Sequence, residues 1–266
     1  MRINIRYPWW LIPTVVLVCA IITNSILTQV FKKKAADKEG KSASTEVTRT
    51  DTGRAGQGSG SLDFTDDTLE QRLIGMGLAD IQAIDSNILV DLRYATSDNF
   101  LKESVYGNLT KCYLRPFAAE MLSRAQDILS ARKPGYRLLV YDGARPLSVQ
   151  RKMWNIARES GNEDYVANPE KGSLHNLGVA VDLTIADAKG MPLDMGSPYD
   201  HFGMISQPRY EKELISSGEL SYEQFENRWL LRSIMREAGF SIILTEWWHF
   251  NAEDKATART KYALIP

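Results

Sequence analysis

The sequence predicts an α+β domain in which helices flank a small, mostly antiparallel sheet. Three observations lead to this class. Helical and strand-like patterns both occur between residues 87 and 244, and the strand-like runs are short. Their spacing lacks the regular strand–helix–strand alternation that builds a parallel sheet. The apolar content of 44% includes six tryptophans, which is enough to fill one packed core.

Three segments are predicted to be helices. Residues 116–131 carry apolar side chains at helical spacing, and Pro134 follows as a helix breaker. Helices are also expected over 147–160 and 221–238, each of which is followed by a glycine.

Four shorter apolar runs are predicted to be strands, namely 87–94, 136–141, 178–184 and 240–244. The second run, YRLLVY, has the pattern of a strand that is buried on both faces.

The first 61 residues differ in composition from the rest. Residues 9–31 form an apolar run without charge, with two arginines before it and three lysines directly after it. Such a run spans a bilayer as a helix, so we expect 1–31 to be an uncleaved membrane anchor, with a cleaved signal segment as the alternative. Residues 32–61 have too few apolar side chains to pack and are predicted to be a flexible linker. The globular domain is then expected over 62–266.

The charges on either side of the apolar run help to predict on which side of the membrane the domain lies. The lysines after the run outnumber the arginines before it, which by the positive-inside rule places the domain in the cytoplasm. An N-terminal anchor with a short basic head, however, commonly exports the domain that it carries. We therefore expect a membrane-anchored domain outside the cytoplasm, with the membrane as a partner through the N-terminal helix.

Charge and cysteine content exclude several classes of protein. The 32 Lys and Arg balance 33 Asp and Glu to a formal net charge of −1, whereas nucleic-acid binders usually carry a basic excess. Cys19 lies in the apolar run, which leaves Cys112 alone in the predicted domain. The domain therefore has no internal disulfide, and a zinc site built on several cysteines is excluded.

Two of the three histidines lie in patterns typical of catalytic zinc sites. His175 precedes a short apolar strand that contains Asp182, and His249 follows Glu246 by three residues. Zinc hydrolases use three His or carboxylate ligands and keep a fourth position open, and a cation removes the cost of a buried carboxylate. The spacing alone does not separate such a site from ordinary core histidines. Glu246 and His249 also reach one metal only if the chain bends near Trp247.

The segments around these residues resemble the zinc D-Ala-D-Ala peptidases, the group that includes lysostaphin-type enzymes and the Hedgehog signalling domain. The motifs S-x-H-x-x-G-x-A-x-D and E-x-W-H of this group are matched by SLHNLGVAVDLT and EWWHF. Within this group, the chain resembles the D-alanyl-D-alanine dipeptidase branch (VanX-type) in the segments DLRYATSDNF, YDGARP, MGSPYD and RSIMREAGF. These matches keep their order over residues 87–250 and so cover nearly all of the predicted domain.

The resemblance implies one Zn²⁺ per chain and assigns the central roles. It implies zinc ligands at His175, Asp182 and His249. It also implies a general base at Glu246 and an oxyanion-stabilising group at Arg145, in YDGARP.

The resemblance further implies contacts to a small peptide substrate, D-Ala-D-Ala. Ser173 and Tyr94 would contact this dipeptide, and Asp200 would pair with its free ammonium group. The family pattern usually has an aromatic residue where this chain has Ala144, a departure that leaves the neighbouring arginine unchanged. His201 matches no position of the family pattern and is interpreted as a bystander.

The implied activity is zinc-dependent hydrolysis of D-Ala-D-Ala to two D-Ala, and two alternatives stand beside it. A zinc D,D-carboxypeptidase of the same superfamily would trim D-Ala from cell-wall stem peptides, a role that suits a membrane anchor. The segments DLRYAT, MGSPYD and the double tryptophan favour the dipeptidase. The other alternative is a catalytically inactive zinc-binding module. It is disfavoured because binding alone needs neither Glu246 nor Arg145.

Overall fold

The computed structural model describes residues 68–162 and 165–266. The predicted anchor at 1–31 and the linker at 32–61 lie outside these residues, as does the domain start at 62, so this division of the chain remains a prediction. Among the described residues, no helix is both long and apolar enough to cross a membrane. This finding corrects the predicted fold and localisation: neither the membrane-spanning helix nor an anchored, extracytoplasmic domain is supported, and no membrane partner is assigned.

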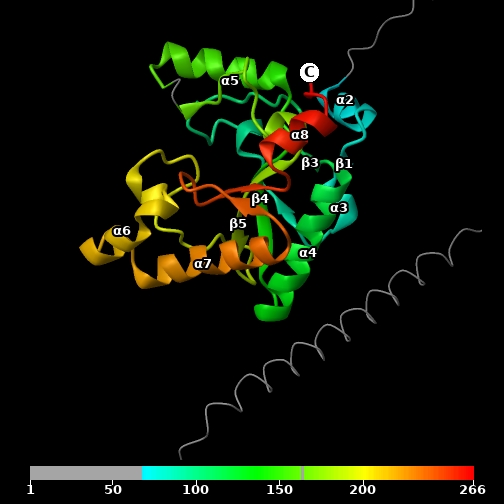
Figure 1. The fold of residues 1–266 in the computed structure, drawn as a ribbon. Helices are drawn as coiled ribbons and strands as arrows, with labels where there is room; N and C mark the ends of the chain where they lie inside the picture. The colour runs from blue at the N-terminus through cyan, green and yellow to red at the C-terminus, as the bar shows by residue number, and fades with distance from the viewer. Residues whose placement is uncertain (1–67, 163–164) are drawn as a thin grey trace, which may run out of the picture. The chain divides into compact units, whose positions relative to one another are not determined.

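A five-stranded sheet in the order β2-β4-β5-β7-β6 forms the centre of the domain (Figure 1). Its strands are β2 (Leu89–Val90), β4 (Arg137–Asp142), β5 (Ala180–Ala186), β6 (Ser241–Ile242) and β7 (His249–Asn251). β2 runs parallel to β4, and the other neighbouring pairs are antiparallel. A separate two-stranded sheet joins β1 (Ala79–Asp80) to β3 (Tyr113–Leu114). The predicted α+β class with a mostly antiparallel sheet is confirmed.

The longer helices lie on both sides of this sheet (Figure 1). α4 (Pro116–Arg132) and α7 (Tyr222–Glu237) contact each other, and they contact β4 and β5, respectively. α5 (Leu147–Glu159) lies on the opposite side of the domain from α7. The shorter helices are α2 (Leu69–Gly75), α3 (Ile81–Ile84), α6 (Glu211–Ser217) and α8 (Lys255–Lys261). Single turns of 3₁₀ helix are η2 (Arg93–Ala95), η4 (His175–Leu177), η5 (Met204–Ser206) and η6 (Pro208–Tyr210).

The three predicted helices form almost as expected because their ends carry local signals. At the start of α7, the Ser221 hydroxyl accepts from the Gln224 backbone N–H at 3.1 Å, and the Gln224 side chain accepts from the Ser221 N–H at 2.9 Å. This reciprocal pair satisfies two backbone donors that the helix leaves free. The strand predicted at 87–94 is shorter than expected, because β2 ends at Val90 and the chain turns into η2 at Arg93.

One face of the central sheet builds the main hydrophobic core. Leu138 and Val140 of β4 and Leu183 of β5 pack there with Leu122 of α4 and Ile234 of α7, and all five are fully buried. Burying such a side chain contributes about 1.5–3 kcal/mol. Side chains alternate along a strand, so the neighbouring residues of β5 point to the other face. That other face carries a group of polar residues, among them Asp182.

Candidate active site

A β-bulge in β4 completes a row of three polar residues on the sheet face opposite the main core. Val140 keeps the regular pairing with β5, but one extra residue follows, after which Asp142 pairs with Asp182. An extra residue reverses the alternation of side chains, so Asp142 turns to the side of Asp182 instead of the side of Val140. Asp182 in turn pairs with His249 of β7. Asp142, Asp182 and His249 therefore lie side by side on three neighbouring strands.

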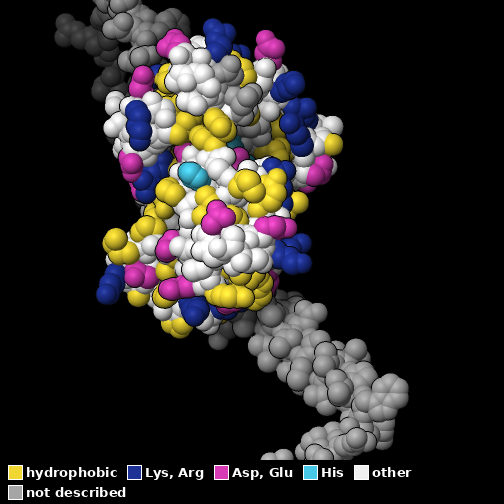
Figure 2. All heavy atoms as spheres, turned by 90° about the vertical axis from the view of Figure 1, so that its left-hand side faces the viewer, with side chains coloured by type: hydrophobic (Ala, Val, Ile, Leu, Met, Phe, Trp, Pro, Cys, Tyr) yellow, Lys and Arg dark blue, Asp and Glu magenta, His cyan; other side chains and the backbone are white. Residues whose placement is uncertain are grey.

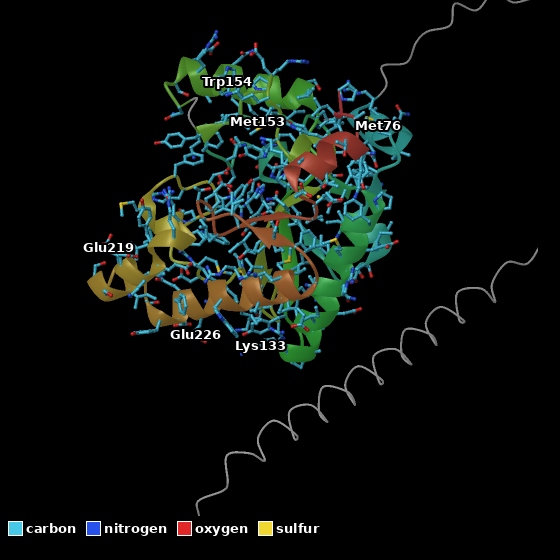
Figure 3. The ribbon with its side chains drawn as sticks, viewed as in Figure 1. Met76, Lys133, Met153, Trp154, Glu219 and Glu226 are labelled. Atoms are coloured by element: carbon cyan, nitrogen blue, oxygen red, sulfur yellow. The ribbon has the colours of Figure 1, made fainter. Side chains whose placement is uncertain are left out.

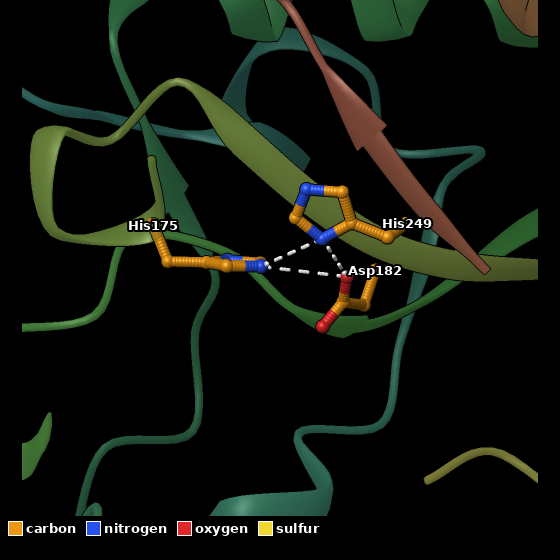
Figure 4. A group of neighbouring side chains, drawn as sticks. All are labelled: His175, Asp182 and His249. Carbon is orange, nitrogen blue, oxygen red and sulfur yellow. Dashed lines mark hydrogen bonds and ion pairs between the residues drawn. The ribbon is translucent and has the colours of Figure 1, made fainter. Parts of the chain in front are cut away.

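His175 reaches the same place from η4, which Gly178 ends. Gly178 has a φ of 73°, and a Cβ there would lie 3.0 Å from Cδ2 of Leu78. Glycine adopts this left-handed backbone without steric cost and lets the chain turn into β5. Figure 4 shows the resulting cluster, in which Nε2 of His175 lies 3.2 Å from Nδ1 of His249. Oδ1 of Asp182 lies 3.4 Å and 2.9 Å, respectively, from these two nitrogens.

Hydrogen bonds on the far side of each imidazole determine which nitrogen faces the cluster. Nδ1 of His175 donates to the Gly143 carbonyl oxygen at 2.8 Å, which leaves Nε2 with its lone pair. Nε2 of His249 donates to Oδ1 of Asn251 at 2.8 Å, which turns Nδ1 toward Asp182 and His175. Tetrahedral zinc with bonds of about 2.0–2.2 Å places its ligand atoms about 3.3–3.6 Å apart. The observed separations of 3.4, 3.2 and 2.9 Å lie within or just below this range, so the three atoms converge closely enough to be ligands of that ion.

The charges of the cluster agree with a cation site. Burial would raise the pKa of Asp182, but His175 and His249 hold that pKa well below its usual range. Burial also disfavours the charged form of His249, yet its hydrogen bond to Asp182 outweighs this effect and raises the pKa of His249 to about 9. A metal ion at this position would compete with that proton.

Glu246 lies between β6 and β7, where residues 243–248 leave the strand conformation and bend. The bend that the sequence required near Trp247 is therefore present. Oε2 of Glu246 lies 3.9 Å from Nδ1 of His249, beside the cluster and outside its three converging atoms. Burial raises the pKa of Glu246, although 35% of the surface of its side chain is exposed. A carboxylate with a raised pKa at this position is suited to proton transfer.

Arg145 is held at the edge of the cluster by two side chains that sequence reasoning missed. Its Nε donates to Oδ2 of Asp142 at 3.0 Å, its Nη2 contacts the same oxygen, and its Nη1 donates to Oε1 of Gln150 at 3.0 Å. Asp142 also accepts from the Tyr106 hydroxyl at 2.5 Å. Burial would lower the pKa of Arg145, but the charge of Asp142 holds it well above its usual range. The guanidinium is therefore charged and fixed in direction.

Asp200 and Tyr94 form a second polar pair next to the cluster. The Tyr94 hydroxyl donates to Oδ2 of Asp200 at 3.0 Å. Asp200 has a φ of 61°, and this left-handed backbone costs a residue with a side chain about 1–2 kcal/mol. Burial raises the pKa of Asp200 well above its usual range, so a cationic partner would stabilise its charged form. Ser173, also nearby, donates its hydroxyl to Oδ1 of Asn176 at 3.2 Å.

A cavity of about 160 Å³ joins these groups. Its wall contains every residue that the sequence assigned to a site: Tyr94, Arg145, Ser173, His175, Asp182, Asp200, Glu246 and His249. Much of the remaining wall is apolar and includes Phe100, Tyr165, Phe202, Trp248 and Met153, which projects from α5 toward the body of the domain (Figure 3). The volume is below the ~300–1,000 Å³ of sites for drug-sized ligands, so the cavity suits a small ligand.

His201 lies outside the group of three converging side chains. It is exposed and lines a neighbouring cavity of about 650 Å³. Figure 2 shows histidine atoms at the surface of the face it draws, with both hydrophobic side chains and uncharged atoms next to them. The residues that the sequence analysis missed differ in how they could have been found. Asp142 follows an apolar strand and lies inside the YDGARP motif, whereas Gln150 and Asn251 carry no signal of their own.

Comparisons with known proteins place the chain among its relatives. A family model described as D-ala-D-ala dipeptidase matches residues 75–265. The D-alanyl-D-alanine dipeptidase of Escherichia coli (strain K12) is 32% identical over 180 residues, which cover 68% of this chain and 86% of that protein. The D-alanyl-D-alanine dipeptidase of Enterococcus faecium is 30% identical over 197 residues, which cover 68% of this chain and 93% of that protein. The solved LD-carboxypeptidase LdcB is 21% identical, with a TM-score of 0.33 over 56% of this chain and 63% of its own.

The family match covers well over half of the chain and includes the whole cluster. The resemblance that the motifs indicated is therefore confirmed, and the chain belongs to the D-alanyl-D-alanine dipeptidase family.

Proposed function

We propose that this protein is a zinc-dependent dipeptidase that hydrolyses D-Ala-D-Ala to two molecules of D-Ala. One observation carries the proposal: three metal-ligand atoms converge beside Glu246 and a charged Arg145 in the wall of one small cavity. Relatives named D-alanyl-D-alanine dipeptidase support the choice of substrate. One Zn²⁺ per chain would be held by Nε2 of His175, Oδ1 of Asp182 and Nδ1 of His249.

The proposed mechanism divides the work between the ion and the side chains. Zn²⁺ at this position would polarise the scissile carbonyl and lower the pKa of water toward about 7. Glu246 accepts the proton of the attacking water and returns it to the leaving amine, a task that its raised pKa favours. Arg145 offers its remaining N–H groups to the developing oxyanion, while Asp142 and Gln150 keep the guanidinium in place.

Asp200 is proposed to bind the free ammonium group of the dipeptide. Tyr94 orients its carboxylate, and burial makes that carboxylate costly to leave charged without a partner. A peptide with a blocked or extended N-terminus would leave it unpaired, and sites of this kind discriminate strongly. Ser173 is proposed to contact the substrate from the wall of the cavity. The small volume and this carboxylate favour a dipeptidase over a carboxypeptidase that acts on stem peptides.

The test compares kcat/KM on free and N-acetylated D-Ala-D-Ala, together with zinc content per chain. Glu246→Gln should keep zinc and lose hydrolysis by about a hundred- to ten-thousand-fold. Asp200→Asn should lose about a hundred-fold on the free dipeptide and far less on the acetylated one. Glu237→Gln, which changes a surface carboxylate paired with Arg132, is the matched control and should leave both rates unchanged.

Each alternative has its own outcome in this experiment. Equal cleavage of both substrates by the wild type would support the carboxypeptidase. Bound zinc without turnover would support the inactive zinc-binding module. Loss of zinc in Glu246→Gln would mean that Glu246 is a ligand and that its role as a base is wrong.

A further inference from the structure

The segment that carries Asp200 is held at both ends by one buried arginine of α7. Arg228 is 0% exposed. Its Nε donates to the carbonyl oxygen of Met195 at 2.6 Å, and its Nη2 donates to the carbonyl oxygen of Ile205 at 2.8 Å. A single planar guanidinium therefore ties together two chain positions that lie on either side of Asp200.

This segment depends on such contacts because it has little regular structure of its own. Residues 195–203 form neither helix nor strand. Within them Asp200 has a φ of 61°, a backbone conformation that side chains disfavour and that persists only where the surroundings hold it. In this conformation Tyr199 reaches Asp182 at 3.1 Å, and Asp200 accepts from Tyr94 at 3.0 Å.

Arg232, one turn further along α7, provides a comparison. Both arginines lie next to Glu211: the two Nη atoms of Arg232 donate to its two oxygens at 2.5 and 2.7 Å, and Nη1 of Arg228 lies 3.5 Å from it. Among the described residues, the hydrogen bonds of Arg232 go to Glu211. The bonds to the two carbonyl oxygens thus distinguish Arg228 from a neighbour that shares its helix, its charge and its acidic partner.

We propose that Arg228 is a positioning residue for Asp200, the proposed binding site of the substrate ammonium group. Its planar guanidinium holds the carbonyl oxygens of Met195 and Ile205 in place, and the segment between them then keeps the Asp200 carboxylate at the cavity. The inference rests on the proposed role of Asp200. Arg228 itself does not line the cavity, so its effect passes through the segment. Lysine would retain the charge beside Glu211, but its single ammonium on a flexible stem cannot reproduce the planar fork.

The test compares Arg228→Lys with Arg232→Lys in the full-length, zinc-loaded protein. Arg228→Lys should raise KM for free D-Ala-D-Ala by about ten- to a hundred-fold, because small misplacements of a binding group have effects of that size. With zinc kept saturating, because Tyr199 of the same segment also contacts Asp182, its kcat and its rate on N-acetylated D-Ala-D-Ala should stay as in the wild type. Arg232→Lys should leave KM unchanged. Arg228→Met, which removes both carbonyl bonds and the charge, should raise KM further.

Three results would overturn the inference: an unchanged KM in Arg228→Lys, an equal rise in Arg232→Lys, or equal losses on both substrates. If Arg228→Met does not fold, the lysine variant decides the question alone. Failure of the proposed function looks different, because it appears in the wild type as no preference for the free dipeptide. A wild type with that preference and an unaffected Arg228→Lys refutes only the role of Arg228.

Discussion

The Tyr199 hydroxyl donates a hydrogen bond of 3.1 Å to Oδ2 of Asp182, and this contact determines which carboxylate oxygen faces the two histidines. Oδ1 is left to the cluster, 2.9 Å from His249 and 3.4 Å from His175. Tyr199 directly precedes Asp200 in the chain. The segment that carries the proposed ammonium site therefore also orients a proposed zinc ligand.

Tyr199→Phe should weaken zinc binding. Removing a hydrogen bond that orients a ligand typically costs about ten- to a hundred-fold in metal affinity, because the free carboxylate oxygen can then rotate. Competition with a chelator measures the affinity. Tyr262→Phe is the control, since this ring stacks on Phe117 outside the cavity. Equal affinities in the two variants would show that Tyr199 does not orient Asp182.

The histidines offer an internal comparison for the metal site. His249→Ala should lose the one zinc per chain expected of a catalytic site with three ligands, because only two would remain. His201→Ala should keep it, since His201 is exposed and lies apart from the cluster. Metal analysis of purified protein measures both. Zinc retained by His249→Ala, or lost from His201→Ala, would contradict the assignment.

Asp142→Asn should lower kcat while zinc stays bound. The asparagine keeps the shape but loses the charge that orients Arg145, and losing one oxyanion-stabilising group costs about a hundred- to a thousand-fold. If Asp142 acts through Arg145, Asp142→Asn should add little to the loss caused by Arg145→Lys. The kcat values of the two single variants and the double variant measure this. If the loss of kcat in the double variant equals the product of the two single losses, Asp142 acts independently of Arg145.

Gly143→Ala should destabilise the fold. A Cβ at this position would lie 2.4 Å from Sγ of Cys112 and 3.0 Å from the Tyr113 carbonyl oxygen. Such overpacking typically costs about 1–3 kcal/mol of unfolding free energy, which urea unfolding measures. Gly75→Ala is the control, because a Cβ there meets nothing within 4 Å. Similar stabilities of the two variants would show that the chain around Gly143 yields without cost.

The fold class, the three long helices and the set of residues at the candidate site could all be predicted from the sequence. The helices follow from signals within a few residues, such as the capping pair of Ser221 and Gln224 in α7. The site residues follow from the family resemblance of several short motifs, because the spacing of the histidines alone does not separate a zinc site from ordinary core histidines. Local composition also led to the membrane anchor, and that expectation found no support among the described residues.

The orientation of the site residues, in contrast, depends on the tertiary structure. The extra residue in β4 turns Asp142 toward Asp182, and this bulge exists only where β4 pairs with β5, a strand that is distant in the sequence. The bonds from Tyr199 to Asp182 and from Arg228 to Met195 join residues 17 and 33 positions apart. Such partners are chosen when distant segments pack together, because each buried polar group must then find a hydrogen bond.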